Sequence, residues 1–222
     1  MCVRGPHALT PTDGPHVPPG LAIAHMGHGM QLAFTDPGGG VSQYLYGLPL
    51  GTPVAFRHTA ANLKVQYPFE GKKTITMLCA GTGITPIYQA LWRVLFTPGD
   101  ERKVVLLYGA RTEGDILLKD QLDEWAAALP HRLTLVYVVG NAPDDPPPAG
   151  WKSRDTYVAE AGWIDRRKIE KYAFPPARDT LCFVCGLPSM YATLCGPREE
   201  KAVREGSVLA ELGYTTPMVA KL

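Results

Sequence analysis

One stretch of the sequence, residues 74–96, constrains the fold more than any other. A run of β-branched and apolar residues stops at Gly-Thr-Gly, residues 81–83, and Thr85 and Pro86 follow as a helix N-cap and a first helical residue. This pattern predicts a strand, a tight turn and a helix. Glycines let a ligand approach the backbone, and a helix N-terminus attracts anions, so phosphate or pyrophosphate is the expected ligand. Gly-x-Gly alone is also typical of a strand-to-helix turn that binds nothing.

The composition of the 222 residues excludes several classes of protein. A hydrophobic content of 45% and a charged content of 19% are ordinary for a globular chain, so disorder is not expected. A formal net charge of +1, without a stripe of Lys and Arg, is not typical of a protein that binds nucleic acid. No run of about 18 or more apolar residues predicts a membrane span, and no membrane tether is expected in this chain.

The cysteines and histidines indicate a reducing compartment and no metal site. Five cysteines are scattered, at positions 2, 79, 182, 185 and 195, which argues against a disulfide framework. The N-terminus lacks the apolar core of a signal peptide, and Cys2 stands where N-myristoylation needs glycine. A location in the cytoplasm or at the cytosolic face of a membrane is therefore expected. His25 and His28 lack further ligands at a matching spacing, so they are interpreted as loop histidines and no metal is predicted.

The first third of the chain predicts a small and incomplete β domain. Residues 1–29 are rich in Pro, Gly and His and are expected to be loop or tail. A strand is expected over 30–35, a turn followed by a strand over 50–57, and a strand or loop over 62–69. A short helix is expected over 42–46, entered through glycines. Residues 30–72 are therefore predicted to form part of an antiparallel barrel.

After residue 73 the pattern changes to alternating strands and helices. Strands are expected over 103–109, 133–139 and 180–186, with a final edge strand over 217–221. Helices are expected over 115–129 and 164–172, at Met190 and over 199–212. The alternation predicts an α/β fold for residues 73–222, a Rossmann-like parallel sheet joined by right-handed crossovers. Because ligands bind beyond the carboxyl ends of such strands, the turns at 81–83 and 185–186 are expected to face one crevice.

Four stretches, in order and at matching spacing, resemble the ferredoxin-reductase superfamily. They are Gly39–Leu45, Gly81–Pro86, Tyr108–Leu118 and Cys185–Met190. Within the superfamily the pattern is most similar to NADH-cytochrome b5 reductase and the flavin domain of nitrate reductase, over about residues 30–222. The resemblance implies an NAD(P)H-dependent flavoprotein reductase in which FAD lies between the barrel and the nucleotide-binding domain. It implies NADH or NADPH as electron donor and a haem protein, such as cytochrome b5, as acceptor.

The resemblance also implies which residues bind each cofactor. For the flavin, Gly40, Val41 and Ser42 would hold the diphosphate, and Thr85 would touch the flavin side. For the nicotinamide nucleotide, the implied residues are Gly81, Thr82, Gly83, Cys185, Gly186, Pro188 and Met190. Thr82 and Cys185 would be the catalytic residues, acting by position beside the nicotinamide rather than as acid or base.

A competing interpretation makes Cys182-x-x-Cys185 a redox dithiol. Such a pair normally begins a helix, where the helix dipole lowers the thiol pKa. Here both cysteines lie on a predicted buried strand, and side chains three residues apart on a strand point to opposite faces. The strand position favours the nucleotide interpretation.

The chain departs from the family pattern in three ways. The flavin motif Arg-x-Tyr-Ser/Thr is absent, so flavin affinity is expected to be poor or lost. Gly140 stands where an acidic residue usually follows the third strand, which weakens a preference for NADH, and Arg111 is either a phosphate contact or a solvated side chain. The chain ends in Leu222 instead of an aromatic residue. Two alternatives to an active reductase remain: a diverged paralogue that binds nicotinamide nucleotide without turnover, and a longer native chain whose start codon is misassigned.

Overall fold

A computed structural model describes residues 40–55 and 65–222. The chain divides into two compact units, Met1–Val54 and Ala55–Leu222. Within the described residues, every helix falls short of the length and hydropathy that a bilayer crossing needs.

The first unit contains the expected short helix. This helix, α2, spans Gly40–Gly47. The turn expected at the start of residues 50–57 is formed, since Thr52 donates a hydrogen bond from its amide to the carbonyl oxygen of Pro49. The strand expected after this turn is not formed in residues 52–55, and its remaining residues lie outside the described ones. The expected strand over 30–35 lies outside the described residues, and residues 65–69 of the second unit form bends and turns. The partial barrel over 30–72 stays a prediction.

The second unit is built on one parallel sheet of six strands. Their order is β4-β3-β2-β1-β5-β6, and every neighbouring pair is parallel. The strands are β1 Thr74–Ala80, β2 Lys103–Ala110, β3 Leu133–Val139, β4 Val158–Ala161, β5 Thr180–Cys185 and β6 Val219–Lys221. The predicted edge strand is confirmed as β6. Strand β4 was not predicted, because Val-Ala-Glu-Ala is too short and too little β-branched to indicate a strand.

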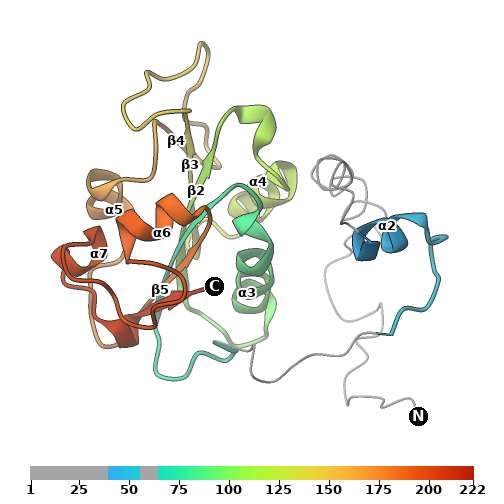
Figure 1. Cartoon of the computed structure of the whole chain (residues 1–222), viewed down its shortest axis with the longest axis horizontal. Helices are drawn as coiled ribbons and strands as arrows, with labels where there is room; N and C mark the ends of the chain where they lie inside the picture. The colour runs from blue at the N-terminus through green and yellow to red at the C-terminus, as the bar shows by residue number, and fades with distance from the viewer. Residues whose placement is uncertain (1–39, 56–64) are drawn as a thin grey trace. The chain divides into compact units, whose positions relative to one another are not determined.

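Helices cover both faces of the sheet, as the alternating pattern predicts (Figure 1). On one face lie α3, Ile84–Phe96, and α4, Lys119–Ala128. On the other lie α5, Arg166–Tyr172, α6, Pro188–Leu194, and α7, Val208–Glu211. Each face has its own apolar core, and the residues of the central strands alternate between the two. Three short 3₁₀ segments complete the unit: η2 Gly81–Gly83, η3 Glu113–Asp115 and η4 Thr216–Met218.

Two helices are shorter than the sequence predicts. The helix expected over 115–129 begins only at Lys119, because Thr112 and Asp115 cap the 3₁₀ turn η3 and Leu118 then adopts a φ of 59°. The helix expected over 199–212 is formed only by α7, at Val208–Glu211. Gly206, at a φ of 76°, ends a non-helical connection just before it.

The start of α3 also differs from the prediction. The helix begins at Ile84 with Gly83 as its N-cap residue, so Thr85 is not the N-cap and Pro86 is not the first helical residue. The cause is η2, which continues directly into α3 and moves the helix start toward the glycines.

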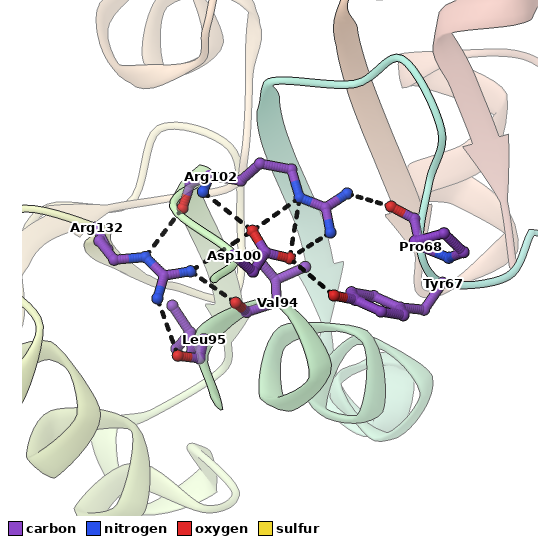
Figure 2. Close-up of polar contacts among 7 residues, drawn as sticks. All are labelled: Tyr67, Pro68, Val94, Leu95, Asp100, Arg102 and Arg132. Atoms are coloured by element: carbon purple, nitrogen blue, oxygen red, sulfur yellow. Dashed lines mark hydrogen bonds and ion pairs between the residues drawn. The ribbon is translucent and has the colours of Figure 1, made fainter. Parts of the chain in front are cut away.

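A cluster of one tyrosine and three charged side chains lies at the amino edge of the sheet (Figure 2). This amino-edge cluster consists of Tyr67, Asp100, Arg102 and Arg132. Asp100 accepts hydrogen bonds from the backbone nitrogen of Arg102 at 3.0 Å, from Nε of Arg102 at 2.9 Å and from the hydroxyl of Tyr67 at 3.2 Å. Arg132 donates to the last carbonyl groups of α3, with Nη1 3.0 Å from the oxygen of Leu95. The cluster thus ties the segment before β1 and the end of α3 to the start of β2.

Candidate nucleotide-binding site

The two glycine turns predicted to share a crevice lie at the same edge of the sheet. Strands β1 and β5 are parallel neighbours, and Cys79 of β1 pairs in register with Cys185 of β5. The turn η2 follows the end of β1, and Gly186 follows the end of β5. Thr82 and Cys185 therefore belong to the same, carboxyl edge, where parallel α/β sheets bind their ligands.

Gly83 brings the two turns into backbone contact. A Cβ atom at Gly83 would lie 2.2 Å from the carbonyl oxygen of Cys185 and 2.7 Å from its carbonyl carbon. No residue with a side chain fits there without a backbone shift. Gly83 is buried by this contact, whereas Gly81 and Thr82 are exposed at the mouth of the turn. Gly81 adopts a φ of +55°, in the left-handed region that favours glycine.

The second turn is packed mainly against side chains. A Cβ atom at Gly186 would lie 2.6 Å from Sδ of Met190 and 3.3 Å from the Cβ atom of Ala80. Pro188 is the first residue of α6 and is exposed, and Met190 of the same helix is half-buried. The structure thus gathers Cys185, Gly186, Pro188 and Met190 beside the end of β1.

Thr85 holds the first turn closed rather than capping the helix. Its hydroxyl donates a hydrogen bond to the carbonyl oxygen of Thr82, at 3.1 Å, and its side chain is exposed. Gly40, Val41 and Ser42, the residues expected at the flavin diphosphate, begin α2 in the first unit.

Tyr108 is a site residue to which sequence reasoning gave no role. Its hydroxyl donates to the carbonyl oxygen of Gly81 at 3.0 Å and accepts from the amide of Leu117 at 3.1 Å. Burial raises the pKa of Tyr108, so the hydroxyl stays protonated and remains a donor. One tyrosine therefore links the turn after β1 to the loop after β2. The sequence feature that could have indicated this role is a polar hydroxyl near the end of an otherwise apolar strand.

Cys185 lies near the hydroxyl of Tyr191 and the carbonyl oxygen of Leu222, and the sequence did not indicate either neighbour. The hydroxyl of Tyr191 donates to the carbonyl oxygen of Leu222, and Sγ of Cys185 lies 4.0 Å from the same oxygen. The amide of Leu222 donates to the carbonyl oxygen of Val184 at 3.0 Å. Burial, followed by the contact with Cys185, raises the pKa of Tyr191. The half-buried thiol of Cys185 is thus flanked by a neutral hydroxyl.

The arrangement of Cys182 and Cys185 does not suit a redox dithiol. Cys182 is fully buried in the core on one face of the sheet, whereas Cys185 packs against the core on the other face. Burial raises the pKa of Cys182, which disfavours its reactive thiolate. All the cysteines of the described residues are free.

No metal site is found in the part of the chain that the structure describes. Those residues contain no group of three or more His, Cys, Asp or Glu side chains that could hold a metal ion. His25 and His28 lie outside the described residues.

Comparison with known proteins identifies the family of this site. Residues 77–196, more than half of the chain, match the model of the oxidoreductase NAD-binding domain. The chain belongs to this family. The matched residues of this NAD-binding domain run from β1 to the end of α6, so they include both glycine turns.

Similar sequences include nitrate reductases and cytochrome b5 reductases. The chain is 38% identical to a nitrate reductase [NADH] of Petunia hybrida over 74% of its length and 18% of that protein. It is 36% identical to NADH-cytochrome b5 reductase 2 of Meyerozyma guilliermondii, over 83% of the chain and 59% of that protein. For the human NADH-cytochrome b5 reductase 2 the identity is 32%, over 82% of the chain and 63% of that protein. The chain thus spans less than two thirds of the length of these relatives.

Solved structures agree with this assignment. The cytochrome b5 reductase domain of Ulva prolifera nitrate reductase is similar with a TM-score of 0.60 and 27% identity, over 82% of this chain and 63% of that one. The CS-b5R domains of human Ncb5or share the fold, with a TM-score of 0.56 and 20% identity, over 84% of this chain and 46% of that one. The expected Rossmann-like α/β fold with a parallel sheet is confirmed, and this member of the oxidoreductase NAD-binding domain family is similar to the cytochrome b5 reductases.

Proposed function

We propose that this chain serves an NAD(P)H-dependent flavoprotein reductase that passes electrons from reduced nicotinamide through FAD to a haem protein such as cytochrome b5. The observation that carries the proposal is the backbone contact between Gly83 and Cys185, which leaves an exposed glycine turn beside the ends of β1 and β5. The names of the relatives, NADH-cytochrome b5 reductase and nitrate reductase [NADH], support the donor and the class of acceptor.

The residues of the carboxyl edge suit a dinucleotide. Gly81 and Thr82 are exposed, so their backbone would be accessible to a pyrophosphate, while the buried Gly83 would hold the turn against the end of β5. Cys185 and Gly186 would lie over the nicotinamide ring, with Pro188 and Met190 shaping its pocket. Hydride transfer between two cofactors needs no protein acid or base. Thr82 and Cys185 would therefore act by orienting the ring and excluding water.

The flavin side of the proposal involves Gly40, Val41, Ser42 and Thr85. The first three begin helix α2, whose N-terminal amides suit a diphosphate. FAD, when bound, takes a hydride from the reduced nicotinamide and releases its electrons singly to a haem protein. Because the sequence lacks Arg-x-Tyr-Ser/Thr, we expect weak flavin binding, with Ser42 and Thr85 as its side-chain contacts.

A titration of the purified full chain with FAD tests this function. The expected result is weak but saturable binding of FAD, together with NADH- or NADPH-dependent reduction of ferricyanide and then of cytochrome b5 in the presence of excess FAD. Ser42→Ala should weaken FAD binding and leave binding of the nicotinamide nucleotide unchanged. A chain that binds no nicotinamide nucleotide would contradict the proposal entirely.

A second function is favoured by the missing flavin motif. A diverged paralogue would bind NADH or NADPH without turnover and act as a binding module. Colourless protein that binds the nucleotide but reduces no acceptor, even with excess FAD, would establish this alternative. For either function, the location of the protein in the cytoplasm or at the cytosolic face of a membrane stays a prediction.

A further inference from the structure

We propose that Tyr191 is a positioning residue, whose hydroxyl fixes the thiol of Cys185 for its contact with the nicotinamide ring. The inference rests on the proposed function, because it concerns the side chain that would lie over that ring. It gives a part in the reaction to a buried residue of α6 that lies outside both glycine turns.

The aromatic ring of Tyr191 is held firmly on one face of the sheet. It is only 3% exposed and packs in the apolar core beneath α5, α6 and α7. The amide of Tyr191 donates to the carbonyl oxygen of Leu187 at 3.2 Å, and its carbonyl oxygen accepts from the amide of Cys195 at 2.9 Å. Because close packing restricts a buried ring, the fold itself determines where the hydroxyl lies.

The hydroxyl of Tyr191 meets residues that belong to the opposite face. Cys185 and Leu222 pack against the apolar core of that opposite face. The hydroxyl donates to the carbonyl oxygen of Leu222, and Sγ of Cys185 lies 4.0 Å from the same oxygen. The amide of Leu222 donates to the carbonyl oxygen of Val184 at 3.0 Å, which keeps Leu222 at the end of β5. One main-chain oxygen is therefore shared by the phenol and the thiol.

This arrangement restricts the orientation of the Cys185 side chain. A thiol is a weak hydrogen-bond donor, and a cysteine side chain has three staggered rotamers, so a half-buried cysteine is not fixed by its own contacts. Burial, followed by the contact with Cys185, raises the pKa of Tyr191, whereas the backbone of Gly186 lowers it. Burial dominates, so the phenol stays protonated and places no charge beside the thiol. A neutral phenol at a fixed position thus favours one orientation of the sulfur.

The alternative is that the hydroxyl of Tyr191 supports the fold alone. Its removal would then lower stability and have no particular effect on the nicotinamide ring. Tyr214 offers a matched comparison, because it is 4% exposed and packs in the same apolar core as Tyr191. Its hydroxyl also donates to a main-chain oxygen, that of Phe174. Tyr214→Phe therefore removes a similar bond that does not involve Cys185.

A double-mutant cycle with two nucleotide probes separates the two roles. NAD⁺ contains the nicotinamide ring and ADP-ribose lacks it, so the ratio of their affinities, measured by calorimetry on the full chain without flavin or turnover, reports on the ring. We expect NAD⁺ to bind more tightly, and Tyr191→Phe and Cys185→Ala each to reduce this ratio about threefold. Because Tyr191 acts through Cys185, adding Tyr191→Phe to Cys185→Ala should have no further effect. Tyr214→Phe should leave the ratio unchanged.

The reactivity of the thiol gives a second measurement, which needs no nucleotide. Mass spectrometry after treatment with iodoacetamide measures the alkylation of each cysteine separately. Cys185 is half-buried, whereas Cys79, Cys182 and Cys195 are buried. We expect Cys185 to be alkylated about threefold faster in Tyr191→Phe, because the thiol loses a neighbour that restricts its access, and at an unchanged rate in Tyr214→Phe. Urea unfolding of both variants, which keep their buried rings, measures the loss of stability separately.

Each other outcome overturns the inference. An unchanged affinity ratio in Tyr191→Phe, or an equal change in Tyr214→Phe, would leave Tyr191 with a structural role alone. A further fall when Tyr191→Phe is added to Cys185→Ala would show that Tyr191 does not act through the thiol. Equal affinities for NAD⁺ and ADP-ribose in the unmodified protein would mean that Cys185 does not contact the ring. Failure to bind either probe would remove the proposed nucleotide site as well, which distinguishes failure of the function from failure of the positioning role.

Discussion

The two edges of the same parallel sheet are held together in different ways. At the carboxyl edge, the contact between neighbouring turns is made by backbone, at Gly83 and Gly186, and polar groups of the turn stay exposed. At the amino edge, the contacts are made by the charged side chains of Asp100, Arg102 and Arg132, and the Asp100 side chain is only 4% exposed. A sheet that must keep one edge open for a ligand gains side-chain stabilisation at the other edge.

Different kinds of substitution should therefore damage each edge. The carboxyl edge should be sensitive to any added volume, because its close contacts leave no room for a Cβ atom. The amino edge should be sensitive to lost charge or lost hydrogen bonds, because its carboxylate is buried and paired. Substitutions at the carboxyl edge should therefore weaken nucleotide binding, whereas substitutions at the amino edge should lower stability and leave binding unchanged.

The largest effect is expected from Gly83→Ala. The added Cβ atom overlaps the Cys185 carbonyl oxygen, at 2.2 Å, so the two turns must move apart. We expect a loss of about 3–4 kcal/mol in the free energy of unfolding and no measurable binding of NADH or NADPH, as determined by urea unfolding and calorimetry. Gly114→Ala is the matched control, because a Cβ atom there meets nothing closer than 3.8 Å. Normal binding by the Gly83 variant would refute the backbone contact as the basis of the site.

Asp100→Asn should have the next largest effect, and at the opposite edge. The substitution removes a buried charge that accepts hydrogen bonds from Arg102 and Tyr67. We expect a loss of about 2–3 kcal/mol in the free energy of unfolding, with the nucleotide affinity unchanged. In the control, Asp179→Asn, the carboxylate is 42% exposed and 3.8 Å from Lys73, so the loss should stay below about 0.5 kcal/mol. A parallel loss of nucleotide affinity would mean that the edges are coupled.

The pH dependence of stability should distinguish the unmodified protein from Asp100→Asn. Burial alone would raise the pKa of Asp100, but hydrogen bonds from the side chain and backbone of Arg102 and the charge of Arg102 lower it below its ordinary value. A lowered pKa in the folded state stabilises the protein above the unfolded pKa of about 3.9, and the stabilisation is lost as the pH falls through the folded pKa. Urea unfolding between about pH 6 and 3 should therefore show a steeper acid loss in the unmodified protein than in Asp100→Asn. Equal slopes would contradict the lowered pKa.

The sequence predicts the sheet and its ligand edge because those features depend on local pattern. Buried parallel strands are continuous apolar runs, and β1, β2, β3 and β5 are found where those runs are. The placement of Gly81–Gly83 beside Cys185 follows from strand order and direction alone. Helix ends were less predictable, because the 3₁₀ turn η2 continues directly into α3 and makes Gly83 its N-cap residue.

What the sequence does not predict depends on contacts between distant residues. The link from Tyr108 to Gly81 and Leu117, the contact of Tyr191 with Leu222, and the amino-edge cluster all need the folded chain. The absence of a side chain at Gly140 was visible in the sequence. Its cause, the backbone of Gly162 in the place of a Cβ atom, was not.

Tyr108→Phe should have the smallest of these effects, and it tests whether the glycine turn needs support from its neighbouring loop. The change removes one hydroxyl that bonds the Gly81 carbonyl and the Leu117 amide, and it leaves the buried ring in place. We expect about 1 kcal/mol less stability and about fivefold weaker nucleotide binding, because the turn loses its tether to the loop after β2. Tyr137→Phe is the matched control: its buried hydroxyl bonds Asp123 of α4 at 2.8 Å, so it should lose similar stability but no affinity. If both variants bound the nucleotide as tightly as the unmodified protein does, the hydroxyl of Tyr108 would contribute to stability alone. The shape of the carboxyl edge would then depend entirely on its glycines.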